Sequence, residues 1–162
     1  MRDQGFALIE LIVVIAIIAT LGTIATINFN SWQRKNQIEG QVKEMLTDLY
    51  DVRLQAIATK DQHQVVMNPN SYVFRRYSSE FDATGQVVFD KNLNYTIQQF
   101  NTGVLSAMSN TPIIVDARGF TDNQMTIAVG IGLGGTPAYN CLVVSGTKVN
   151  MGRINGNSCD LQ

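Results

Sequence analysis

The sequence has few of the residues from which active sites and metal sites are usually built. Its 162 residues include one histidine, His63, and two cysteines, Cys141 and Cys159. Two cysteines with a single histidine far away along the chain are a poor ligand set for zinc. No nucleophile, base and orienting acid form a recognisable catalytic constellation. We therefore expect a protein that is not an enzyme and has no cofactor or metal, with His63 as a solvated loop or strand residue.

The chain also lacks an excess of charge of either sign. After Ile27 it holds 11 Lys and Arg residues and 11 Asp and Glu residues, so this part is formally neutral. A neutral domain has no bulk electrostatic attraction for nucleic acid or for anionic lipid. Any function that depends on charge must therefore come from a local cluster.

Charge is almost absent from residues 6–27, where Glu10 is the one charged residue among 22. A helix of this length covers about 33 Å, which is enough to cross the hydrocarbon core of a bilayer. This stretch is therefore predicted to be a transmembrane helix. An unpaired carboxylate in such a helix costs a few kcal/mol and implies a partner, unless the side chain lies shallow enough to reach headgroup water.

A secretory signal peptide is the alternative interpretation of this stretch. It requires a basic leader, a core of about 7 to 15 apolar residues and a small-residue cleavage site after that core. Here the leader, residues 1–5, is very short, the apolar run is too long, and no Ala-x-Ala site follows. The pattern argues against processing by signal peptidase.

The junction Gly5-Phe6-Ala7-Leu8-Ile9-Glu10 resembles the class III leader of type IV pilins and type II secretion pseudopilins. The resemblance implies that prepilin peptidase cuts between Gly5 and Phe6 and methylates the new amino terminus of Phe6. Residues 1–5 are then a cleaved leader peptide. Glu10, the fifth residue of the mature chain, is the residue that the resemblance assigns to assembly.

The resemblance also implies a location: the bacterial inner membrane, crossed once, with the C-terminal domain in the periplasm until the subunit enters a filament. A count of positive charges does not favour this orientation, because Arg34 and Lys35 follow the apolar run while the leader has Arg2 beside Asp3. Cleavage at Gly5 requires the leader to be cytoplasmic, and we give that requirement precedence.

Beyond the membrane segment, residues 28–60 are predicted to continue the helix. Apolar residues repeat there at spacings of three and four, which is the pattern of one buried helix face. These residues are Ile38, Val42, Met45, Leu49, Val52 and Ala56. Phe29 and Trp32, just past the apolar run, are expected to anchor the helix at the membrane–water interface.

From residue 61 to residue 162 the pattern changes to short β-rich runs separated by turn residues. The runs are residues 64–67, 72–77, 86–90, 95–100, 112–115, 125–129, 141–144 and 148–154. Asp116 and Arg118 are expected to form a turn pair. The run Gly130–Gly135 contains a weak Gly-x-Gly-x-x-Gly match, but no helix opens after it, so we expect a mobile hairpin connection there. The predicted fold class is α+β: a long helix, half membrane-spanning and half amphipathic, packed on an antiparallel β-sheet domain.

Three stretches of the soluble part are similar to the H-type minor pseudopilins, the GspH/FimT class. They are Arg53–Ile57 with Val65-Val66, then Pro112–Phe120, and Cys141–Arg153 with Cys159. In that class a cysteine pair closes a terminal hairpin. An even number of cysteines in an exported domain also favours a disulfide between Cys141 and Cys159, with two free buried thiols as the alternative.

This second resemblance implies a structural minor subunit near the tip of a periplasmic pseudopilus of type II secretion, or one that primes a type IV pilus. The implied partners are other pilin or pseudopilin subunits, prepilin peptidase, the inner-membrane assembly platform, the membrane and, for secretion, a protein cargo.

Two alternatives remain open. The first is a FimT-like minor pilin that binds DNA through Lys148 and Arg153, but two cations neutralise few phosphates and make DNA an improbable partner. The second is a major pilin of a surface fibre. Ile27 stands where major pilins usually carry a helix-bending proline, which counts against it.

Overall fold

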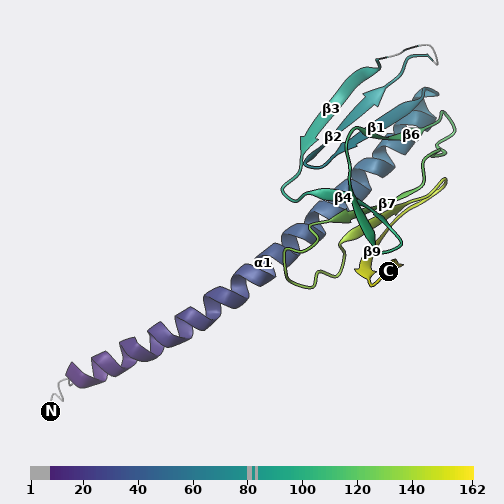
Figure 1. The fold of residues 1–162 in the computed structure, drawn as a ribbon. Helices are drawn as coiled ribbons and strands as arrows, with labels where there is room; N and C mark the ends of the chain where they lie inside the picture. Colours follow the sequence, from purple (N-terminus) through teal and green to yellow (C-terminus); the bar gives the residue numbers. More distant parts are fainter. Residues whose placement is uncertain (1–7, 80–81, 83) are drawn as a thin grey trace.

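The computed structural model describes residues 8–79, 82 and 84–162, with the backbone alone for residues 24–28. Its longest element is a single unbroken helix, α1 (Leu8–Thr59), which has 52 residues and is about 78 Å long. No proline occurs before Pro69 to interrupt it. It ends where Lys60 takes a left-handed φ of 62° and donates its backbone N–H to the Ala56 carbonyl. Figure 1 shows the N-terminal half projecting away from the β domain.

The C-terminal half of α1 lies against the β domain along the predicted apolar stripe. All six stripe residues are buried, at no more than 5% exposure: Ile38, Val42, Met45, Leu49, Val52 and Ala56. They join one hydrophobic core with residues from the strands. The helical periodicity of the sequence is therefore confirmed as the face on which the strands pack.

The first sheet has four antiparallel strands in the order β3-β2-β1-β6. Its strands are β1 (His63–Asn68), β2 (Ser71–Arg76), β3 (Gln86–Asn92) and β6 (Thr111–Val115). The turn at Pro69-Asn70 makes β1 and β2 a hairpin, with Val66 opposite Val73. The β6 strand returns from far along the chain to pair with β1, placing Val115 opposite His63.

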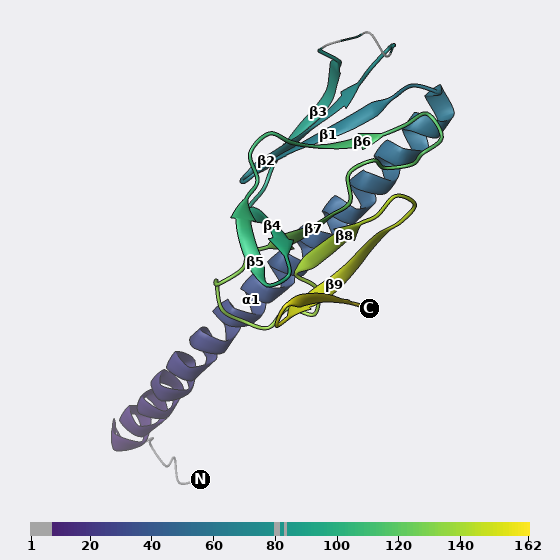
Figure 2. The same cartoon turned by 45° about the vertical axis from the view of Figure 1, so that its right-hand side comes forward.

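The second sheet has six antiparallel strands in the order β10-β9-β8-β7-β4-β5. Its strands are β4 (Ile97–Asn101), β5 (Val104–Ala107), β7 (Met125–Val129), β8 (Cys141–Val144), β9 (Val149–Asn155) and β10 (Ser158–Leu161). Figure 2 shows the two sheets side by side along α1.

The antiparallel α+β prediction is confirmed, and the eight expected strands are present with small shifts at their ends. Two strands were missed, β5 and β10. The β5 strand is exposed at all four residues, and β10 has a mixed polar composition, so neither shows the alternation that marks a half-buried strand. The division into two sheets was also not foreseen.

A buried glutamine helps to fix the β domain on the helix. Gln41, on α1, is 6% exposed and donates to the Tyr95 carbonyl at 2.8 Å while accepting from the Tyr95 N–H at 2.9 Å. Both ends of the buried amide are thereby satisfied, which avoids the cost of an unpaired polar group. The segment between β3 and β4 is held on the helix at this point.

Candidate functional site

Glu10 lies in the first turn of α1 among exposed aliphatic side chains. Its neighbours Ile9 and Leu11 are 70% and 56% exposed. In the described part of the chain, the Glu10 carboxylate has no hydrogen bond and no ion pair. Gly5 and Phe6 lie outside the described residues. The helix thus presents a carboxylate on an apolar surface that none of the described residues covers.

Among the residues that the structure describes, no helical stretch has both the length and the hydropathy needed to cross a membrane. The predicted transmembrane segment, residues 6–27, lies partly outside them: residues 6 and 7 are not described, nor are the side chains of residues 24–28.

The two cysteines are joined in a disulfide, as predicted, with their Cα atoms 6.3 Å apart. Cys141 lies on β8 and Cys159 on β10, so the bond links two strands that are separated by β9. The two cysteines pair with β9 residues two positions apart: Cys141 lies opposite Gly152 on one side, and Cys159 lies opposite Ile154 on the other. The disulfide therefore crosses over β9.

Gly152 allows both the β10 backbone and the disulfide to approach β9 closely. A Cβ atom at its position would lie 2.4 Å from the Asp160 carbonyl oxygen and 2.9 Å from Cys159 Sγ, too close to either without displacement. The sequence analysis did not assign Gly152 this role. A glycine inside a strand pattern is a signal of close approach, and here it could have been used.

Comparison with known families identifies a motif in the N-terminal segment. Residues 1–26 match the prokaryotic N-terminal methylation motif. The chain carries the prepilin signature that is typical of type IV pilins and pseudopilins. The motif implies processing by prepilin peptidase, anchoring in the inner membrane through the N terminus, and assembly with pilin subunits. No curated protein and no solved structure matches the chain.

The fold agrees with this prepilin signature, because a long N-terminal helix packed on antiparallel sheets is the pilin-like arrangement. Pilin-type proteins act as structural subunits rather than as enzymes. The H-type subclass expected from the sequence is not distinguished by the motif, which ends at residue 26.

The two cations considered for DNA contact do not form one basic patch. Lys148 is exposed in the turn before β9, and Arg153 is exposed five residues later on the strand itself, roughly 16 Å away at the rise of a strand. Arg153 lies opposite Asp160 on β10, whose negative charge offsets the positive charge of the arginine. This arrangement gives the DNA alternative no added support.

His63 is not the solvated residue that we expected. It is fully buried at the start of β1, where its ring stacks on Phe74 with centroids 5.2 Å apart and its Nδ1 lies 3.0 Å from the Asp61 carbonyl. The reason is its register, since alternate β1 residues face the core and His63 shares that face with Val65 and Met67. It is a core residue, and no carboxylate or nucleophilic side chain among the described residues is hydrogen-bonded to it.

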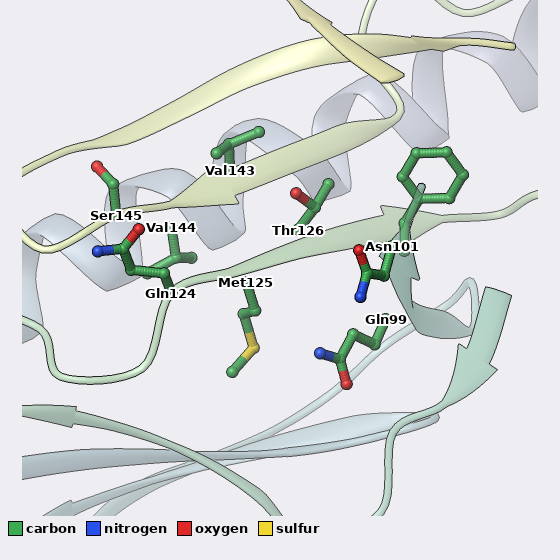
Figure 3. A pocket seen from close by; sticks show the side chains of 9 residues that line it. Gln99, Asn101, Gln124, Met125, Thr126, Val143, Val144 and Ser145 are labelled. Carbon is green, nitrogen blue, oxygen red and sulfur yellow. The ribbon is translucent and has the colours of Figure 1, made fainter. Parts of the chain in front are cut away.

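A hollow of about 270 Å³ lies over β4, β7 and β8, three neighbouring interior strands of the second sheet (Figure 3). Its polar lining consists of amide and hydroxyl side chains, including Gln99, Asn101 and Gln124, around Met125. The lining residues carry neither a charge nor an imidazole, so the hollow offers no acid, base or metal ligand. The described residues also contain no cluster of three His, Cys, Asp or Glu side chains that could hold a metal ion.

A half-buried polar cluster holds β2 and β3 on α1. Tyr72 donates its hydroxyl hydrogen to Asp48 Oδ2, and Lys91 Nζ lies 2.7 Å from the same oxygen and 2.9 Å from Glu44 Oε1. Burial raises the pKa of the Tyr72 hydroxyl, and its hydrogen bond to Asp48 adds to the effect. The sequence carries no signal for this cluster, because its members come from three separate elements.

Proposed function

We propose that this chain is a minor structural subunit of a pilin-type filament: an H-type minor pseudopilin near the tip of a periplasmic type II secretion pseudopilus, or a subunit that primes a type IV pilus. Residues 1–5 are the cleaved leader, residues 6–27 the transmembrane helix, residues 28–60 its amphipathic continuation, and residues 61–162 the periplasmic β domain.

The observation that carries the proposal is the combination of the methylation motif with the two halves of α1. The motif occupies residues 1–26, at the start of a helix whose second half is buried under the sheets. The first half exposes a nearly continuous aliphatic surface, including Ile12, Ile15 and Ile18. Such a surface is stable in lipid before assembly and against other apolar helices afterwards.

Glu10 supplies a reason for the subunit to leave the bilayer. Cutting after Gly5 creates a cationic amine on Phe6, and an axial offset between two stacked helices brings one subunit's amine near another's Glu10. In an apolar setting such a pair gains far more than in water, whereas an unmatched carboxylate pays desolvation. The pairing therefore favours entry into the filament.

The uninterrupted helix supports a minor rather than a major subunit. No proline loosens α1 at Ile27, and the helix continues without a break through this position. The disulfide supports a periplasmic location for the β domain, because disulfides form and persist in oxidising compartments.

The test is the recovery of processed chain in purified filaments, with every subunit quantified by mass spectrometry. We expect the wild-type chain at a small fraction of the main subunit. Glu10→Ala should leave processing intact and lower recovery, with Glu10→Asp intermediate because its carboxylate is one methylene shorter. A matched control is Asp51→Ala, which removes an exposed helix carboxylate outside the apolar half.

One outcome contradicts the minor-subunit proposal: if the chain is the most abundant subunit of the filament, it is a major pilin. If Glu10→Ala is recovered as well as wild type at matched expression, Glu10 has no pairing role in this subunit, and a tip position or a carboxylate accommodated by lipid is the better account.

A further inference from the structure

The connection between β7 and β8 folds back onto α1 on the side of its N-terminal half. In Figures 1 and 2 this yellow-green loop lies at the end of the β domain that faces the projecting part of the helix. Two helix side chains hold it there. Arg34 Nη1 donates to the Leu133 carbonyl, and Glu39 Oε1 accepts from the Ala138 N–H at 2.6 Å.

Glycines allow this loop to follow the helix so closely. Gly130 and Gly135 have φ values of 61° and 83°, in the left-handed region that favours glycine. A Cβ at Gly130 would lie 3.0 Å from Ile38 Cδ1, and one at Gly135 would lie 3.8 Å from the Ser31 carbonyl oxygen. The loop is therefore fixed against residues 31–38 of α1 rather than extended into solvent.

The surface around this loop has the composition of a membrane interface. From residue 123 to residue 147 the chain has no Asp, Glu, Lys or Arg, and Leu133 at the loop tip is 41% exposed. On the adjacent helix, Phe29 and Trp32 are 58% and 59% exposed, with ring centroids 6.0 Å apart. Aromatic rings next to basic residues, here Arg34, are typical of the membrane–water boundary.

The loop lies along the helix close to the outer boundary of the headgroup layer. Ser31 lies four residues past Ile27, and Arg34 lies seven residues past it, so their levels are about 6 and 10 Å above the end of the apolar run. The headgroup layer extends about 5 to 8 Å beyond the hydrocarbon core on each side, so Ser31 lies within it and Arg34 just above it. A tilt of about 20°, common for membrane helices, brings the loop still closer to the bilayer on one side.

We propose that the loop of residues 130–135 is a second membrane contact of this chain. Leu133 enters the headgroup layer beside Phe29 and Trp32, while Arg34 and Lys35 face anionic headgroups. The loop then sets the tilt of α1 and holds the β domain down on the bilayer until the subunit is extracted into a filament. This inference rests on the proposed membrane anchoring of the helix.

The single tryptophan of the chain makes the contact measurable. The full chain is reconstituted into vesicles of phosphatidylcholine and phosphatidylglycerol, with and without bromine on the acyl chains near the headgroups. Fluorescence quenching by bromine requires proximity to the lipid. Three proteins are compared: wild type, Trp32→Phe with Leu133→Trp, and Trp32→Phe with Phe120→Trp as the control.

Phe120 is a matched control because it is 46% exposed but lies beside Gly119, where an added Cβ would lie 2.7 Å from Ile57 Cδ1, near the far end of α1. We expect quenching of Trp32 in wild type and of the tryptophan at 133, and none at 120. The quenching at 133 should decrease when phosphatidylglycerol is replaced by neutral lipid. All three substitutions are at exposed positions, and circular dichroism checks that each protein is folded.

The outcomes separate this inference from the proposed function. Quenching of Trp32 without quenching at 133 overturns the loop contact and leaves the membrane anchor in place. Absence of quenching at Trp32 itself contradicts the anchor on which both proposals rest.

Discussion

Asp116 holds together the turn that follows β6. Its carboxylate accepts hydrogen bonds from the backbone N–H groups of Arg118, at 2.9 Å, and Phe120, at 2.8 Å, and from the Arg118 guanidinium at 2.8 Å. Burial alone would raise the pKa of Asp116, but the Phe120 and Arg118 hydrogen bonds outweigh it and hold the pKa below its usual value. The turn pair expected from the sequence is confirmed.

The lowered pKa of Asp116 predicts how stability depends on pH. A folded-state pKa below the unfolded value of about 3.9 contributes stability that is present above pH 4 and lost as the pH falls towards the folded pKa. Asp116→Asn should therefore lower the free energy of unfolding at pH 7, by less than ~1 kcal/mol because the ion pair is solvent-exposed. Its disadvantage relative to wild type should shrink below pH 4.

Urea unfolding of the full chain in detergent, from pH 7 to pH 2.5, measures this difference. Both proteins retain an acid-dependent loss of stability from Asp82 and Asp160, whose pKa values are also lowered by hydrogen bonds, so the contribution of Asp116 is the difference between the two curves. A constant difference between the two proteins across the whole range would show that Asp116 does not titrate as described.

The burial of His63 could have been predicted from its position in the strand. Its position two residues before Val65 and four before Met67 places it on the core face of β1, and this spacing was visible in the sequence. A lone histidine in a polar-looking stretch is assigned to solvent by composition, whereas strand alternation assigns it to the core. The alternation is the better guide because one strand face is buried.

At the level of elements, the last three strands form a unit that depends on Gly152. We expect Gly152→Ala to lower the free energy of unfolding by about 1–3 kcal/mol, because the new methyl group overlaps both the Asp160 carbonyl oxygen of β10 and Cys159 Sγ. Removing the disulfide with Cys141→Ser and Cys159→Ser should itself cost about 3 kcal/mol, for 18 residues of separation. In that background Gly152→Ala should cost less, because β10 can move away.

The control is Gly40→Ala on α1, where a Cβ meets nothing within 4 Å. This change should stabilise the chain by up to ~1 kcal/mol through helix propensity. Urea unfolding of wild type, Gly152→Ala, the double cysteine variant and the combination of the two gives a double-mutant cycle. Equal costs of Gly152→Ala with and without the disulfide would refute a steric conflict between this residue and the crossing.

On the scale of the whole molecule, one helix connects the processed terminus to the β domain. We predict that the mature chain begins at Phe6 with an N-methylated amine, and that Gly5→Val blocks processing because the peptidase needs a small side chain there. Intact-mass measurement of membrane-purified protein decides the point. The control Gly22→Val lies inside the apolar run, where a Cβ has open space, and should be processed normally.

A mass that corresponds to a chain starting after Ala19 or Ala25 would instead indicate cleavage by signal peptidase and would contradict processing by prepilin peptidase.

The sequence by itself determined the features that depend on neighbours along the chain. The apolar run, the spacing of Ile38, Val42 and Met45, and the short β-rich run of Met125–Val129 are each local patterns, so the helix and most strands could be predicted. The junction at residues 5–10 could likewise be recognised as a short sequence motif.

Only the tertiary structure decided how these elements combine. The pairing of His63 with Val115, the pairing of Ile97 with Val129, and the disulfide across β9 each join segments far apart in sequence. Such partners are selected by the sum of many weak contacts in a shared core rather than by any local pattern. The contact of the loop of residues 130–135 with Arg34 is likewise a feature of the tertiary structure, because the position of a loop depends on the surface against which it packs.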